Sequence, residues 1–148
     1  MPYLRLTCPD LPANRRQTIA RVLTEAIDKL LFDPRAGISP DDLRRRTTVH
    51  FLPYGPAELF IGDEAAEADT APDITLELSD WGMSVRQRRR LASQLTPVVA
   101  GLFDMPREKW DSINVRFHPY RLTEFAVGGR LLSDLVPRIG QIVRRLAG

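Results

Sequence analysis

The sequence contains little of what usually identifies a cofactor or metal site. Its 148 residues include one cysteine, Cys8, so an intrachain disulfide and a cysteine metal cluster are excluded. The only two histidines, His50 and His118, lack neighbouring carboxylates, so no metal site is expected. No apolar run reaches the ~18 residues of a membrane span, and residues 1–5 do not resemble a signal peptide. We therefore expect a cytoplasmic protein without a membrane partner.

Charge of one sign is also missing. The chain has 21 Lys and Arg residues against 19 Asp and Glu residues, a net charge of +2. A balance this close to zero disfavours nucleic acid as a partner. Arginines cluster at 44–46 and 86–90 and are expected on solvated faces, with an anionic partner as the alternative. Cys8 ends an apolar strand and is interpreted as a buried thiol rather than a nucleophile.

Hydropathy patterns predict the elements of the first half. Leu4, Leu6 and Cys8 alternate with polar residues and indicate a strand at the N-terminus. Asn14 is a candidate cap for a helix that ends near residue 32, before Pro34. Residues 37–42 are interpreted as a polar loop. Residues 47–52 predict a second strand, followed by a short extended return at 59–62.

The second half repeats this order. After an acidic linker at 63–71, a strand is predicted at 73–78 and a helix capped by Ser84 extends to Met105. A fourth strand is predicted at 113–117 and an extended return at 125–129. Residues 131–148 indicate a terminal amphipathic helix.

The two halves form an internal repeat. Pro2 opens one unit and Pro72 the other, residues 47–54 match 113–120, and residues 58–62 match 124–128 loosely. Each unit is a β-α-β crossover with parallel strands. The predicted fold is α/β (α+β): one domain, 1–148, with repeats at 2–62 and 72–130 and a four-stranded sheet with two helices on one face. The other face is expected to be apolar and to be buried by oligomerisation.

With these features the chain resembles the tautomerase superfamily. The shared features are a proline directly after Met1, the β-α-β unit and the hairpin sequence Phe125-Ala126-Val127-Gly128-Gly129. The first unit is similar to 4-oxalocrotonate tautomerase at residues 24–27 and 47–49. The doubled unit is closest to the fused, trimeric branch, which includes cis-3-chloroacrylic acid dehalogenase, malonate semialdehyde decarboxylase and macrophage migration inhibitory factor. The resemblance implies a cofactor-free tautomerase, a homotrimer, and a small 2-oxo or enol carboxylic acid as substrate.

The resemblance assigns the central role to Pro2. Removal of Met1 would leave a secondary amine, whose pKa burial and nearby arginines would lower from a reference of ~7.7–8.0. A neutral amine near pH 7 can take a proton from the carbon next to a carbonyl. The nitrogen of Pro72 is bonded in a peptide and cannot do this.

The other site residues expected from the resemblance bind substrate. Arg116 would hold its carboxylate, and His50 stands at the same position of the first unit. Phe125 and Trp81 would form apolar pocket walls, and Glu124 would orient a water molecule. The alternatives are a solvated arginine, a core phenylalanine and a surface glutamate.

At two places where members of the family have arginines, this sequence has other residues. The loop at 9–12 lacks the arginine of 4-oxalocrotonate tautomerase, and residues 79–83 lack the arginine pair of the dehalogenase and the decarboxylase. Ile27 stands where the dehalogenase has a histidine. The alternatives therefore stay open: a hydratase, dehalogenase or decarboxylase of the same superfamily, or a catalytically inactive binding protein with this fold.

Overall fold

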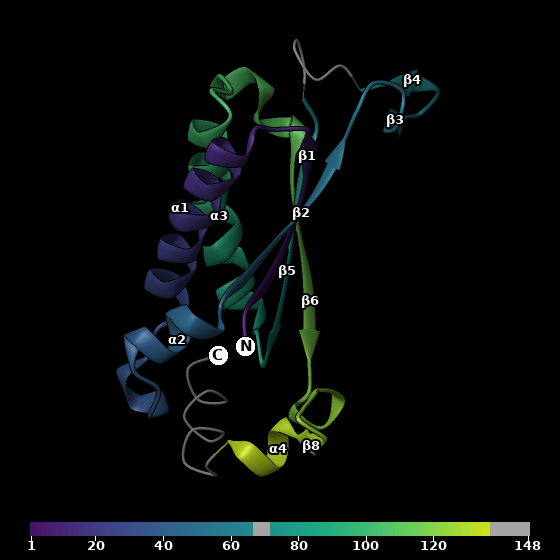
Figure 1. The fold of residues 1–148 in the computed structure, drawn as a ribbon. Helices are drawn as coiled ribbons and strands as arrows, with labels where there is room; N and C mark the ends of the chain where they lie inside the picture. Colours follow the sequence, from purple (N-terminus) through teal and green to yellow (C-terminus); the bar gives the residue numbers. More distant parts are fainter. Residues whose placement is uncertain (67–71, 137–148) are drawn as a thin grey trace.

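The computed structural model describes residues 1–66 and 72–136. A four-stranded mixed sheet, in the order β2-β1-β5-β6, forms one layer, and two long helices cover one of its faces (Figure 1). The strands are β1 (Tyr3–Pro9), β2 (Thr48–Tyr54), β5 (Ile74–Trp81) and β6 (Ile113–Tyr120), and the helices are α1 (Ala13–Leu31) and α3 (Val85–Leu102). This confirms the predicted fold class and its helix-covered sheet.

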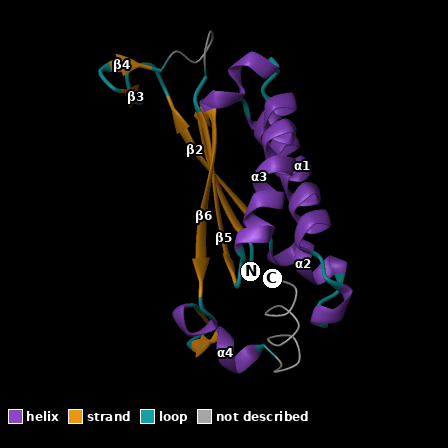
Figure 2. Cartoon of the chain, turned by 180° about the vertical axis from the view of Figure 1, so that it is seen from behind, coloured by secondary structure: helices purple, strands orange, loops and turns teal. Residues whose placement is uncertain are grey.

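Each half is a β-α-β crossover. β1 is parallel to β2 and β5 is parallel to β6, whereas β1 and β5 are antiparallel at the centre of the sheet. The start of β1 therefore lies beside the end of β5. Figure 2 shows that the N-terminus, α2 (Pro40–Arg46) and α4 (Leu132–Leu135) lie at this same end of the sheet.

Short elements complete both halves. Each half ends in a two-stranded hairpin, β3 (Phe60–Ile61) with β4 (Glu64–Ala65) and β7 (Ala126–Val127) with β8 (Arg130–Leu131). Gly62 and Gly128 take positive φ at the two hairpin turns, a conformation that glycine adopts without a steric penalty. The remaining elements are 3₁₀ turns: η1 (Pro34–Ala36), η2 (Arg107–Ser112) and η3 (Leu122–Glu124).

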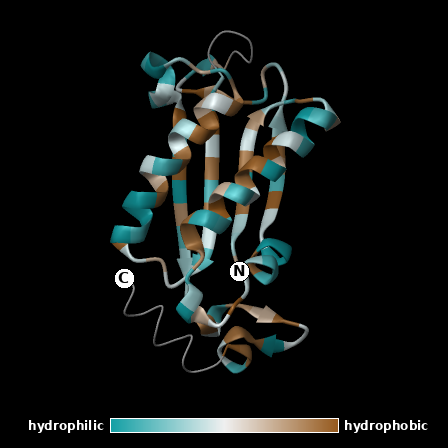
Figure 3. Cartoon of the chain, turned by 90° about the vertical axis from the view of Figure 1, so that its left-hand side faces the viewer, coloured by the Kyte–Doolittle hydropathy of each residue, from teal (hydrophilic) through white to brown (hydrophobic). Residues whose placement is uncertain are grey.

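The core lies between the sheet and the two long helices. Leu6 faces Leu76 across the two central strands, and both side chains are fully buried. Ile19 and Leu23 of α1 and Leu95 of α3 pack onto them from the helix layer. Figure 3, seen from the helix side, shows hydrophilic colour on the outer turns of the helices and hydrophobic colour on the strands behind them. Burial of these aliphatic side chains holds the layers together.

The expectation of an apolar second sheet face is wrong. The open face carries Arg5, His50, Glu77, Arg116 and His118, and Glu77 forms ion pairs with Arg5 at 3.6 Å and His118 at 3.0 Å. The physical reason is the strand alternation itself, because most apolar residues of the strands, among them Leu4, Leu6, Leu76 and Leu78, lie on the helix side. Any burial of this face must therefore accommodate charge.

Local predictions need three corrections. Asn14 is not the helix cap, because α1 begins at Ala13 after Pro12. The predicted loop at 37–42 contains the start of α2, which Ser39 caps by accepting a hydrogen bond from the Asp42 N–H. The linker predicted at 63–71 contains β4, and its residues 67–71 lie outside the described residues.

Other local predictions agree with the structure. Ser84 caps α3 in a reciprocal capping box with Gln87. Of the predicted terminal helix, Leu132–Leu135 is helical and residues 137–148 lie outside the described residues. Among the helices described, none is long and apolar enough to cross a membrane.

Candidate active site

Pro2 lies buried at the start of β1, beside the end of β5. Its carbonyl accepts a hydrogen bond from the Thr48 N–H at 3.0 Å, which joins the residue before β1 to the start of β2. Tyr3 pairs with Ser79 in the antiparallel register, so the next step along both strands brings Pro2 beside Asp80. The sheet therefore fixes the position of the pyrrolidine ring from both sides.

Two hollows meet at Pro2. The first, here called the apolar hollow, lies under the loop after α1 and is lined by Met1, Pro2, Leu31, Phe32, Asp33, Ala36, Ile38, Leu43, Arg46, Asp80, Trp81, Leu132 and Val136. The second, here called the hairpin hollow, is lined by Met1, Pro2, Tyr3, Arg46, Thr48, Ser79, Tyr120, Glu124 and Phe125. Met1, Pro2 and Arg46 line both, so a small molecule in either hollow would lie against the N-terminus and an arginine.

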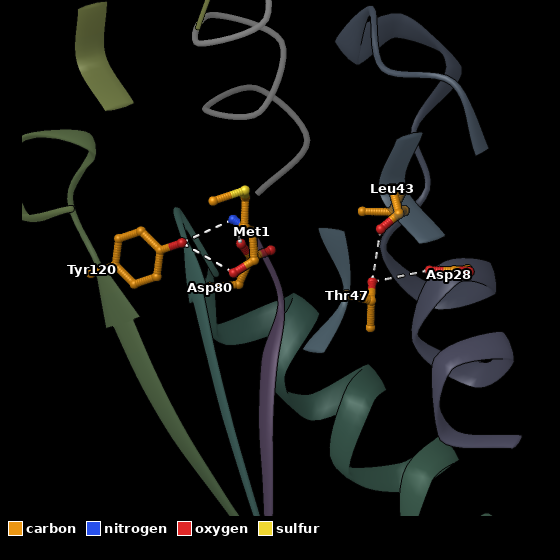
Figure 4. Close-up of polar contacts among 6 residues, drawn as sticks. All are labelled: Met1, Asp28, Leu43, Thr47, Asp80 and Tyr120. Carbon is orange, nitrogen blue, oxygen red and sulfur yellow. Dashed lines mark hydrogen bonds and ion pairs between the residues drawn. The ribbon is translucent and has the colours of Figure 1, made fainter. Parts of the chain in front are cut away.

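The N-terminus itself is held by a polar clamp, shown in Figure 4. The Met1 ammonium donates to Asp80 Oδ1 at 2.8 Å and to the Tyr120 hydroxyl at 2.9 Å. The Tyr120 hydroxyl also lies 3.2 Å from the Met1 carbonyl oxygen. Asp80 is fully buried, and among residues 1–66 and 72–136 it is the one charged side chain in the buried set. A carboxylate at such depth is favourable only with a cation and hydrogen bonds around it.

Arg46 reaches the hollows from the last residue of α2. The following residue, Thr47, has its hydroxyl 3.2 Å from Asp28 Oδ1 on α1 and 3.0 Å from the Leu43 carbonyl (Figure 4). This contact fixes the end of α2 against α1. The Arg46 side chain is exposed and has no hydrogen bond or ion pair with any residue in the described part of the chain. Its guanidinium is available to an anion.

Besides Pro2, three of the predicted site residues line these hollows. Phe125 and Glu124 line the hairpin hollow, where the Phe125 ring stacks on Tyr120 with centroids 5.3 Å apart. Trp81 lines the apolar hollow and is nearly buried. Apolar walls of this kind exclude water from a reacting group.

Arg116 and His50 are not brought to Pro2 within the chain. Both lie on the open sheet face, where His50 Nδ1 is 2.8 Å from the Tyr3 hydroxyl and Arg116 stands opposite Glu77. The charge of Arg116 acts on Asp73, at the end of the sheet away from Pro2. Burial raises the pKa of Asp73, and Arg116 partly opposes this.

The Glu124 carboxylate has a structural contact. Its Oε2 accepts the Arg121 N–H at 2.7 Å and closes the turn after β6. In the first half, Glu58 Oε2 accepts the Gly55 N–H at 2.5 Å in the corresponding turn. Because Glu58 makes this contact where no terminal amine is present, turn closure alone accounts for a glutamate here.

Cys8 and the histidines do not contribute to the site. Burial raises the pKa of the Cys8 thiol to about 11, which leaves it protonated at neutral pH and agrees with a buried thiol. No group of three or more His, Cys, Asp or Glu side chains that could hold a metal was found among residues 1–66 and 72–136.

Sequence reasoning missed Asp80, Tyr120 and Arg46. Asp80 follows the alternation of Leu76 and Leu78 and so occupies an inward position, a signal that was present in the strand pattern. Tyr120 repeats Tyr54 in the matched segments. Arg46 could have been placed from the sequence Ser39-Pro40-Asp41-Asp42, which is typical of a helix start.

The comparisons with known proteins rest on structure alone. No protein-family model and no curated protein matches the sequence. Among solved structures, a wild-type fused 4-OT in an asymmetric trimer aligns with a TM-score of 0.71 and 18% identity, over 90% of this chain and 98% of that chain. The chain has the tautomerase fold. At this identity the likeness establishes the fold and leaves activity open.

Two other solved structures also align over most of both chains. Pt0534, solved after inactivation by 2-oxo-3-pentynoate, aligns with a TM-score of 0.72 and 12% identity, over 90% of this chain and 98% of that chain. A member of the cis-3-chloroacrylic acid dehalogenase family aligns with a TM-score of 0.69 and 18% identity, over 98% of this chain and 90% of that chain.

Proposed function

We propose that this chain is a tautomerase of the tautomerase superfamily that uses Pro2 as the general base on a small 2-oxo or enol carboxylic acid. One observation carries the proposal: Pro2 is buried where two hollows meet, with an arginine and a polar clamp beside the N-terminus. Met1 must be removed first, because an amide nitrogen does not accept a proton.

The reaction needs one proton carrier. The Pro2 nitrogen would take the proton from the enol hydroxyl or from the carbon next to the carbonyl, and would return it to the other atom. No group is added or lost, and the amine ends as it began. The ring fixes the direction of the lone pair, and the Thr48 hydrogen bond fixes the ring.

Arg46 is the residue that we propose for the substrate carboxylate. It is the cation shared by both hollows, and it has no ion pair within the described residues. A guanidinium matches a carboxylate with two parallel N–H donors. Arg116, which the resemblance assigns to this task, could reach a site only in another copy of the chain, since it lies on the open face of its own sheet.

A homotrimer fits the exposed surfaces. The similar fused 4-OT is a trimer. In this chain the two hairpins expose Phe60, Ile61, Val127 and Leu131, and β2 and β6 are the edge strands of the sheet. Apolar hairpins next to free strand edges are suited to contacts between subunits. Sedimentation equilibrium should give about three times the chain mass, and a stable monomer would contradict the trimer.

Addition of water is the second candidate function. Glu124 lines the hairpin hollow with Pro2, so a hydratase or dehalogenase could use it to orient water. The turn-closing contact of Glu124 weakens this assignment. A decarboxylase and an inactive binding protein are the remaining alternatives, and both predict no tautomerisation.

The test combines a substrate panel with covalent labelling. Intact mass should first show loss of Met1. Enol and 2-oxo acids, phenylenolpyruvate included, should then be ketonised by the wild-type protein. Treatment with 2-oxo-3-pentynoate should abolish activity and place its adduct on the Pro2 peptide, with protection by substrate. A retained Met1, or an adduct elsewhere that abolishes activity, would contradict Pro2 as the base.

A further inference from the structure

The arginines at 86–90 are a feature of the sequence that the proposed function does not use. Arg86, Arg88, Arg89 and Arg90 lie on the first turns of α3, and residues 85–88 include no acidic side chain. Cations at the start of a helix are disfavoured by the helix dipole, and Arg86 and Arg90 also repel each other at i,i+4 spacing. Together they reduce the stability of the helix start unless an anion offsets them.

One of the four, Arg90, lines a hollow between the end of α1 and the start of α3. This α1–α3 hollow has a volume of about 430 Å³, and small-molecule sites have roughly 300–1,000 Å³. Arg86 and Arg89 line neither this hollow nor the two hollows at Pro2. We propose that the α1–α3 hollow is a second binding site, which takes a small organic anion with an apolar body.

The corresponding space in the first half is bridged by an arginine. When the buried positions of α1 and α3 are matched, Gln87 stands where α1 has Arg15, and Leu30 stands where α3 has Leu102. Arg15 Nη2 donates to the Leu102 carbonyl at 2.9 Å and joins the start of α1 to the end of α3. The Gln87 side chain instead caps its own helix, and within the described residues it has no hydrogen bond to Leu30. The space beside Gln87 therefore stays open.

The polar wall of the α1–α3 hollow is positively charged. Among the described residues that line it, the charged ones are Asp33, Arg35 and Arg90. Arg35 donates to both carboxylate oxygens of Asp33, at 2.9 and 2.8 Å, so these two charges offset each other. The Arg90 side chain has no hydrogen bond or ion pair within residues 1–66 and 72–136. Its guanidinium can therefore offer two parallel N–H donors to a phosphate or carboxylate.

The other lining residues in the described part of the chain are apolar. They are Leu30, Leu31, Phe32, Pro34 and Leu91. Phe32 is 37% exposed, so a ligand that covers it removes apolar surface from water. Free phosphate would leave this wall uncovered, whereas a ring that carries the phosphate would cover it. The lining therefore favours an amphipathic organic anion over an inorganic one.

The proposed site shares a wall with the site at Pro2. Residues 31–33 line both the α1–α3 hollow and the apolar hollow. Gln87, Arg90 and Leu91 line the α1–α3 hollow and neither of the two hollows at Pro2. The backbone N–H groups of these three residues can therefore report on the second site separately.

The experiment is a ¹⁵N NMR titration of the full chain with phenyl phosphate, followed at the N–H groups of Gln87, Arg90 and Leu91. We expect saturable shifts with a Kd of about 1 mM or below. Arg90→Gln should weaken binding at least about tenfold, because a charge-assisted contact is lost. Arg89→Gln removes the same charge one position away and should change the Kd by less than about threefold. Inorganic phosphate and phenol should each bind more weakly than phenyl phosphate.

Several results would overturn the proposal. These are a lack of saturable shifts at about 10 mM phenyl phosphate, an unchanged Kd in Arg90→Gln, and binding of inorganic phosphate or phenol as tight as that of phenyl phosphate. The shifts should also persist in Arg46→Ala, since their loss there would assign them to the hollows at Pro2. The titration measures no turnover, so each result holds whether or not the chain is a tautomerase.

Discussion

The two ends of the sheet use the same scaffold around different chemistry. At one end the Tyr120 hydroxyl contacts the amine and the carbonyl of Met1, at the start of β1. At the other end the Tyr54 hydroxyl contacts the N–H and the carbonyl of Asp73, at the start of β5. Each tyrosine ends a strand that is parallel to one central strand, so each reaches the beginning of the other central strand.

The difference lies in what each tyrosine meets. The Pro72 end carries a continuous chain, so its tyrosine closes a structural contact between two peptide groups. The Pro2 end carries a chain terminus, and there α2 adds Arg46 and β5 adds the buried Asp80. The comparison shows that the duplicated fold supplies two equivalent frames with different surroundings. Under the proposed function, proton transfer takes place only at the end that carries Pro2. Matched substitutions in the two halves test this directly.

The largest expected effect is a loss of stability from core substitutions, and it should be similar in both halves. Leu6→Ala and Leu76→Ala each remove a fully buried side chain from the centre of the shared core. Each should lower the free energy of unfolding by about 2–5 kcal/mol. Urea unfolding followed by circular dichroism gives the values. A large loss in one variant with a negligible loss in the other would show that the halves do not share one core.

The next largest expected effect is the slow alkylation of Cys8 in the folded protein. Burial raises the pKa of its thiol from 9.0 to about 11, so the thiolate forms only as the pH approaches that value. Iodoacetamide at pH 8 should therefore react at least about a hundredfold more slowly in the folded protein than in urea. The rate is followed by intact mass. Equal rates in both states would place Cys8 outside the core of the first half.

Arg46→Ala should weaken substrate binding at the Pro2 end of the sheet. Loss of a charge-assisted contact should raise the KM for a carboxylate substrate about ten- to hundredfold, with a smaller change in kcat. Arg107→Ala, on the corresponding short element η2, is the matched control and should leave KM unchanged. A rise in KM for Arg116→Ala with none for Arg46→Ala would move the anion site to a neighbouring subunit.

The smallest effect is expected for Glu124→Gln. The amide can still accept the Arg121 N–H, so both the turn and proton transfer by Pro2 should survive, with kcat changed less than about threefold. Glu58→Gln is the control in the other half. Steady-state kinetics give the kcat of both variants. A collapse of kcat confined to Glu124→Gln would assign water addition to this site.

Much of the fold could be predicted because strand alternation and helix periodicity are local. The repeat of Pro2 and Pro72 and the cap at Ser84 were visible in the sequence, and the fold class followed. The site was less accessible. Arg116 was chosen by likeness to a motif, yet strand parity turns it to the open face. The contact between Asp80 and the N-terminus depends on antiparallel pairing of residues 79 positions apart, which no local pattern reports.

The most direct measurement compares Pro2→Ala with Pro72→Ala in the same ketonisation assay, with loss of Met1 verified by intact mass. The two prolines occupy matched positions, and only one becomes a terminal amine. We expect kcat/KM to fall at least about tenfold for Pro2→Ala, because the general base loses its ring and its fixed direction, and to remain within about twofold for Pro72→Ala. Equal turnover by wild type and Pro2→Ala would contradict the account.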